Sequence, residues 1–437
     1  MEVEYSPYIA VIATSVVIIL SYLFNVVSSK TNVPSVLLLI ILGIGLKQAA
    51  VYFGIDTGDF LFSVLEILGI VGLTMIVLEA ALDLELTQEK WPIIWKSFLV
   101  ALAALVVTSI ASTYIIQRFF IDDFFTALVY AVPLSIISSA IVIPSVGALA
   151  AEKKEFMVYE STFSDILGIM FFYFLLGNRD SETTGTIVWH VTSNIAITIV
   201  LSVMISYALV ILFQKLDTNV KLFLLIAVLL LLYALGKLFH LSSLVIILVF
   251  GLVLNNHRLF FFKPLNRLLD TRALSGVLHN FHMVTLETAF VMRTFFFVVF
   301  GMTITLASIF DPEVAMVSGI LLLVLYAVRL LMLLIFVRKD ILPQLFIAPR
   351  GLITVLLFFS IPEALQTDGF NAGVLLFVII ITSVIMTLSL ILGGNRIEPY
   401  EDFASNYWDA VDEEIDKIET AEKKAQGDKK DARSEVY

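Results

Sequence analysis

The chain has 437 residues, of which 59% are hydrophobic and only 15% charged, with a net charge of −11 and a mean hydropathy of +0.99. A soluble protein of this size needs more polar surface, so the composition indicates a membrane protein, and the acidic balance argues against nucleic-acid binding. The sequence has no cysteine, no HExxH zinc motif and no nucleotide-binding glycine loop. We therefore expect no cofactor, no enzyme activity and no nucleotide-driven pumping.

Apolar runs between polar breaks follow one another along most of the chain. A bilayer core of about 30 Å requires about 20 apolar residues in a helix. The acidic N-terminus is unlike a signal peptide, so the first run is expected to remain as a span. The sequence predicts an all-α polytopic membrane protein with about thirteen transmembrane helices, at 8–28, 34–53, 60–82, 94–117, 124–149, 159–177, 187–213, 221–237, 242–256, 277–305, 312–337, 345–366 and 370–393.

The basic residues of the predicted loops are distributed unevenly between the two sides of the membrane. The loops and adjoining span ends on the side of the C-terminal tail contain thirteen Lys and Arg residues, and those on the other side contain four. Because basic loops stay in the cytoplasm, this alternation predicts a cytoplasmic C-terminus and an external N-terminus.

Several ionisable residues fall inside predicted spans and therefore mark function or a charged partner, and Asp165 and Arg329 are the hardest to explain by exposure at the membrane interface. Asp165 lies in the sixth span, with Ser161 one turn away and Glu160 about 140° around the helix. A carboxylate near hydroxyls can hold a dehydrated cation or a proton, but not both; the alternative is a polar stripe that only packs against protein. Arg329 lies in the eleventh span and needs a buried carboxylate, for which Glu160 is preferred over Glu79 and Glu287.

Two spans carry prolines at positions that predict broken helices. Pro133 and Pro144 bracket Ser138 and Ser139 in the fifth span, and the twelfth contains Pro349-Arg350-Gly351. Proline removes a backbone donor and interrupts a helix. Paired broken helices in two halves of a chain are typical of inverted-repeat transporters, in which they cross at the membrane midplane. Two simple proline kinks are the alternative.

Several of these segments resemble motifs of the cation/proton antiporter superfamily, in particular NhaP-like sodium/proton exchangers. Glu160-Ser161-x-x-Ser164-Asp165 is similar to the ES-x-x-ND element, and Ala348-Pro349-Arg350-Gly351 to the GLRG stretch. VLEAALDLEL, from Val77, resembles the FE-x-GL element. The fifth span lacks the TDP element, and its IISSAIV is more similar to potassium-efflux antiporters.

The resemblance implies a role for each of these residues. Asp165 would bind the cation and the proton in turn, beside the hydroxyls of Ser138, Ser139, Ser161 and Ser164. Glu160 and Arg329 would form a structural ion pair, and Arg350 would compensate charge at the broken helices. Serine at position 164 cannot carry a second proton, which favours electroneutral exchange.

The family also implies the organisation of the chain and its setting. We expect exchange of Na⁺, with Li⁺ or K⁺ as alternatives, for H⁺ by a homodimer in the bacterial inner membrane, serving pH homeostasis. A cation channel or an ion or pH sensor on the same scaffold is the alternative function. The implied division is scaffold and dimerisation helices at 1–93 and 217–308, ion-binding core helices at 94–180 and 309–394, a linker helix at 181–216, and a charged cytoplasmic tail at 395–437.

Overall fold

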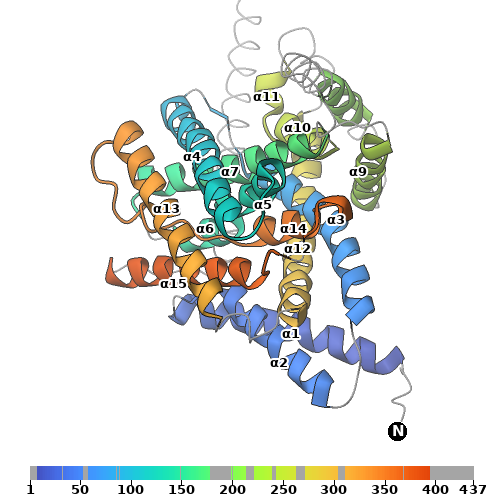
Figure 1. Ribbon diagram of the computed structural model, residues 1–437. Helices are drawn as coiled ribbons and strands as arrows, with labels where there is room; N and C mark the ends of the chain where they lie inside the picture. Colours follow the sequence, from blue (N-terminus) through green and yellow to red (C-terminus); the bar gives the residue numbers. More distant parts are fainter. Residues whose placement is uncertain are drawn as a thin grey trace, which may run out of the picture.

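The computed structural model describes most of the region expected to lie in the membrane (Figure 1). The described residues are 7–31, 33–52, 58–84, 86–87, 89–147, 149–177, 198, 200–212, 221–238, 243–261, 271–303, 311–367 and 369–393. Within these ranges the regular structure is helical, and seven helices are long and apolar enough to cross a membrane, with shorter apolar helices beside them. The expected all-α polytopic membrane fold is confirmed.

The described helices follow the predicted spans closely. Those of the first half are α1 (Pro7–Thr31), α2 (Ser35–Tyr52), α3 (Gly58–Asp83), α4 (Trp91–Phe119), α5 (Phe124–Ser135), α6 (Ser139–Ser145) and α7 (Ala151–Gly177). Those of the second half are α9 (Lys221–Leu238), α10 (Ser243–Asn255), α11 (His257–Phe260), α12 (Thr271–Thr303), α13 (Pro312–Phe336), α14 (Leu352–Phe359), the short 3-10 helix η3 (Glu363–Leu365) and α15 (Gly373–Leu392). Only residues 198 and 200–212 of the predicted span at 187–213 are described, and the predicted tail at 395–437 lies outside the described residues.

The helices pack in two sets (Figure 1). In one set, α12 contacts α2 and α3, and α3 also contacts α10. In the other, α4 lies against α5, α7 and α13, and α13 also contacts α15. The broken element formed by α5 and α6 belongs to this second set, since both of its halves contact α7.

Two glycines allow α2 and α12 to touch through their backbones. A Cβ added at Gly43 would lie 2.9 Å from the Cα of Gly301, and one added at Gly301 would lie 3.0 Å from the Cα of Gly43. Both additions would also collide with a carbonyl oxygen of the facing helix. Small residues permit this close approach, which membrane helices use because burial of apolar surface does not drive their association.

Aspartate side chains cap the N-termini of two helices. Asp123 precedes α5, and its Oδ2 accepts hydrogen bonds from the backbone N of Thr126 at 2.7 Å and from its Oγ1 at 2.7 Å. Asp311 precedes α13, and its Oδ1 accepts from the backbone N of Glu313 at 2.9 Å. These caps satisfy amide groups that the first turn of a helix leaves unpaired.

The fifth and twelfth predicted spans are both interrupted. The first break separates α5 from α6 at residues 136–138, three residues after Pro133. The second differs from a helix with a single break, because residues 342–346 form turns and residues 347–351 are non-helical before α14 begins. Pro343 and Pro349 lack the amide donors that a helix would need here, and Pro362 prevents α14 from continuing.

Candidate ion-binding site

The two interrupted segments meet each other inside the bundle. The backbone N of Ser138, in the first break, donates a hydrogen bond of 2.9 Å to the carbonyl oxygen of Pro349, in the second. Nε of Arg350 donates to the carbonyl oxygen of Leu134 at 3.0 Å. Backbone groups freed by the breaks therefore find partners across the crossing, as groups buried away from water must.

Gly351 allows the crossing to be this tight. A Cβ at position 351 would lie 2.7 Å from Oγ and 3.0 Å from Cβ of Ser138, and 2.8 Å from Cδ1 of Ile141. The glycine is needed for space, since its φ of −163° is extended backbone that any residue adopts.

We expect Gly351→Ala to destabilise the protein by about 1–3 kcal/mol, because the added methyl group overpacks the contact with Ser138. The measurement is the melting temperature of the purified protein in detergent. Gly319→Ala is the matched control, since a Cβ at Gly319 on α13 meets nothing within 4 Å. Equal melting temperatures for the two variants would contradict the close packing of the crossing.

Asp165, on α7, lies next to the start of α6. Its side chain is 4% exposed. Its Oδ2 accepts a hydrogen bond of 3.0 Å from the backbone N of Ser139 and a second from the Ser139 hydroxyl. Its Oδ1 is also buried and has no hydrogen-bond partner among the described residues. The carboxylate is thus held by one oxygen, while the other has no hydrogen-bond partner among the described residues.

The hydroxyl groups of the other three predicted serines, Ser138, Ser161 and Ser164, have hydrogen-bonding environments that differ from that of Ser139. Oγ of Ser164 accepts a hydrogen bond of 2.9 Å from the backbone N of Ile137, so it supports the first break. Oγ of Ser161 donates to the carbonyl oxygen of Val158 at 3.2 Å. Oγ of Ser138 is buried and has no partner among the described residues. Among the four serines, Ser139 is thus the one that the structure hydrogen-bonds to Asp165.

Glu160 and Arg329 form a two-pronged ion pair in the interior. Nη1 of Arg329 lies 2.7 Å from Oε1 of Glu160, and Nη2 lies 3.1 Å from Oε2. The side chains are 4% and 0% exposed. The guanidinium also donates to the carbonyl oxygen of Gln344, from Nε at 3.0 Å and from Nη2 at 2.7 Å. One side chain therefore joins α7, α13 and the turn at 342–346.

Arg350 directs its side chain to backbone carbonyls at the crossing. Besides the bond to Leu134, its Nη1 donates to the carbonyl oxygen of Ala348 at 2.6 Å. Its backbone N donates to Oγ1 of Thr382, on α15, at 3.0 Å. Leu134 lies in the last turn of α5, where carbonyl groups carry partial negative charge. The guanidinium therefore lies against carbonyl groups at the end of α5.

Two polar side-chain contacts join α3 to α12, and the sequence did not indicate either pairing. Nη2 of Arg293 lies 3.0 Å from Oε1 of Glu79. Nε2 of His282 lies 2.9 Å from Oδ1 of Asp83. The sequence offers Glu79 as an alternative partner for Arg329, but the structure pairs Glu79 with Arg293 instead. The presence of Glu79 and Arg293 inside predicted spans indicates that each needs a charged partner, but their positions in the sequence do not show that they pair with each other.

Two broken segments crossing beside a buried carboxylate define the class of the molecule, a secondary transporter of inverted-repeat type. The comparisons agree with this class. The profile of the family "Sodium/hydrogen exchanger, transmembrane" matches residues 14–394, and the chain belongs to this family of cation/proton antiporters. A search of curated proteins found no significant match.

Solved structures show the same fold. The sodium proton antiporter MjNhaP1 from Methanocaldococcus jannaschii at pH 8 aligns with a TM-score of 0.65 and 18% identity, covering 88% of this chain and 96% of that one. An electron-microscopy structure of the same antiporter aligns with a TM-score of 0.64 and 18% identity, covering 89% and 95% of the two chains. The resemblance stated from the sequence motifs is confirmed.

Proposed function

We propose that the protein exchanges a monovalent cation, Na⁺ in the first place, for H⁺, and that the two ions compete for Asp165. The observation that carries this proposal is the environment of the carboxylate. One oxygen is held by Ser139, and the other is buried without a partner among the described residues. The protein thus fixes the position of the group while leaving one carboxylate oxygen without a hydrogen-bond partner among the described residues.

Competition follows from the cost of burying charge. An ionised carboxylate in a low-dielectric interior is costly unless a cation or a proton neutralises it. Either ligand would occupy Oδ1, so binding of one excludes the other. Oγ of Ser138 is an additional oxygen ligand for the cation, since it is also buried and unpaired in the described part of the chain. Ser161 and Ser164 would contribute after a rearrangement of their present hydrogen bonds.

A single exchangeable charge supports electroneutral exchange, one cation for one proton. Glu160 is already paired with Arg329. The residue before Asp165 is Ser164, whose hydroxyl accepts from a backbone amide and cannot carry a second proton. With Asp165 neutral in both loaded states, the core could cross the membrane interior, whereas the empty, charged state could not.

The remaining organisation is proposed by analogy with the family. The core helices at 94–180 and 309–394 would move against the scaffold at 1–93 and 217–308, with 181–216 connecting them. We propose a homodimer in the cell membrane, acting in pH homeostasis, with the N-terminus outside and the C-terminus in the cytoplasm. The distribution of basic residues supports this orientation.

Electroneutral coupling predicts that a membrane potential does not drive exchange. In proteoliposomes with a fixed pH gradient, the initial rate of cation-dependent proton movement should be the same at zero potential and at an imposed potential of either sign. A titration with Na⁺, Li⁺ and K⁺ at one pH gives the order of affinities. Cation flux that continues when proton counterflow is prevented would indicate a channel and contradict the proposal.

A further inference from the structure

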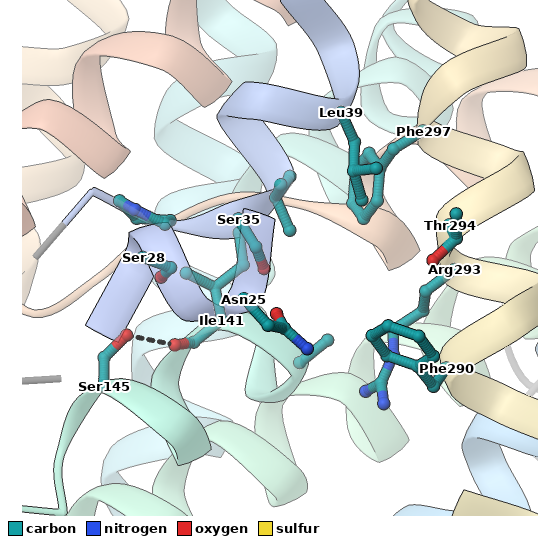
Figure 2. Close-up of a pocket in the computed structure, with 13 residues that line it drawn as sticks. Asn25, Ser28, Ser35, Leu39, Ile141, Ser145, Phe290, Arg293, Thr294 and Phe297 are labelled. Carbon is teal, nitrogen blue, oxygen red and sulfur yellow. Dashed lines mark hydrogen bonds between the residues drawn. The ribbon is translucent and has the colours of Figure 1, made fainter. Parts of the chain in front are cut away.

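A pocket with mixed polar and apolar lining lies between the two sets of helices, next to the element that holds Asp165 (Figure 2). It encloses about 620 Å³ of space, part of it open to solvent. One wall includes Asn25 and Ser28 of α1, and another includes Arg293 of α12. Ala140 also lines the pocket, and it directly follows Ser139, whose backbone and hydroxyl both donate to Asp165. The pocket therefore borders the candidate ion site.

Arg293 dominates the electrostatics of this pocket. Of the described residues that line it, Arg293 alone carries a formal charge. Figure 2 shows its guanidinium beside Phe290, on the side of the pocket away from Ser28. The side chain is 12% exposed, so its charge is only partly screened by solvent. A cation that enters this pocket therefore experiences the field of this guanidinium.

Glu79 pairs with Arg293 and offsets that charge, although it is not itself among the residues that line the pocket. Its Oε1 lies 3.0 Å from Nη2 of Arg293, and its own side chain is 8% exposed. The positive charge of Arg293 raises the free energy of a cation in the pocket, and the negative charge of Glu79 lowers it again. The pair therefore makes the net charge of this pocket wall close to zero, and the hydrogen bond to Glu79 holds the guanidinium of Arg293 in position.

We propose that Glu79 preserves the affinity of the antiporter for its cation by neutralising Arg293 in the wall of this pocket. This inference rests on the proposed function, since it concerns the route to Asp165. It assigns a positioning and affinity role to two residues that lie outside the crossing. The pair acts on the approach of the cation and leaves exchange at Asp165 unchanged once the cation is bound.

Charge variants of the pair test the proposal in inside-out membrane vesicles, with Na⁺ titrated at constant pH. Glu79→Gln adds one positive unit to the pocket wall and should raise KM for Na⁺ about three- to tenfold, with kcat within about twofold of the unmodified protein. Glu79→Gln/Arg293→Gln restores the net charge and should return KM to within about twofold. Asp83→Asn is the matched control, because it breaks the other α3–α12 pair, and its KM should not change.

A second pair of variants avoids breaking a buried ion pair. Asn25 is half-buried and lines the pocket. Asn25→Lys should raise KM for Na⁺, and Asn25→Asp should lower it. If the pocket had only a structural role, both substitutions would shift KM in the same direction. The inference is overturned if Glu79→Gln leaves KM unchanged, if the double variant does not restore it, or if the two Asn25 variants shift KM together. Asp165→Asn tests the proposed function separately. If exchange survives in that variant, the proposed function fails; if exchange is lost, the KM results for Glu79 and Asn25 test the present inference alone.

Discussion

Asp165→Asn should abolish cation-dependent proton movement in proteoliposomes, reducing it to the level of vesicles without protein. The substitution keeps the size of the side chain and an oxygen that can accept from Ser139, but it removes the group that carries charge or a proton. A neutral amide neither attracts a cation into the interior nor releases a proton in exchange. The measurement is the change in internal pH after addition of Na⁺ under an imposed pH gradient.

The control for this variant is the same chemical change at Asp83, another aspartate with a side-chain partner. Asp83→Asn alters the contact with His282 between α3 and α12 and should keep exchange. If Asp165→Asn transports at the rate of the unmodified protein while folding normally, the ion site lies elsewhere.

Arg329→Ala should lower the stability of the protein by about 3–5 kcal/mol, because it leaves Glu160 as a buried charge without its partner. It also removes the donors that satisfy the carbonyl oxygen of Gln344. The melting temperature in detergent should fall markedly. In the fraction that remains folded, the order of preference among Na⁺, Li⁺ and K⁺ should not change, since Arg329 does not contact Asp165 among the described hydrogen bonds.

A double variant separates the ion pair from general damage to the core. Glu160→Leu/Arg329→Met replaces both charges with apolar groups, a change that often costs little when the new side chains fill the space. It should recover part of the stability lost in Arg329→Ala. A melting temperature for Arg329→Ala equal to that of the unmodified protein would show that the pair does not hold α7, α13 and the turn at 342–346 together.

Much of the fold could be predicted from the sequence because the bilayer imposes a simple requirement on it. Each span must be long and apolar, so the limits of α4 and α13 were visible as hydrophobic runs. The breaks were visible because Pro133 and Pro349 remove amide donors. The form of the second break was not, since several prolines near one another leave open which residues become turns and which become extended.

The candidate site was predictable residue by residue but not in its contacts. Helical geometry placed Glu160 and Asp165 on different faces, and the structure gives them different partners, Arg329 and Ser139. The same reasoning placed Ser161 beside Asp165, yet its hydroxyl donates to the carbonyl oxygen of Val158. Periodicity gives the face on which a side chain lies, but not which segment of a distant helix faces it, so the partnership of Glu79 and Arg293 required the folded structure.

The glycine contact between α2 and α12 has a mechanical consequence. Where main chain rests on main chain at Gly43 and Gly301, there are no rotamers that could relax to accommodate sliding. These two helices should therefore behave as one rigid body. Any conformational change during transport must then occur at other helix interfaces, where longer side chains can change their contacts.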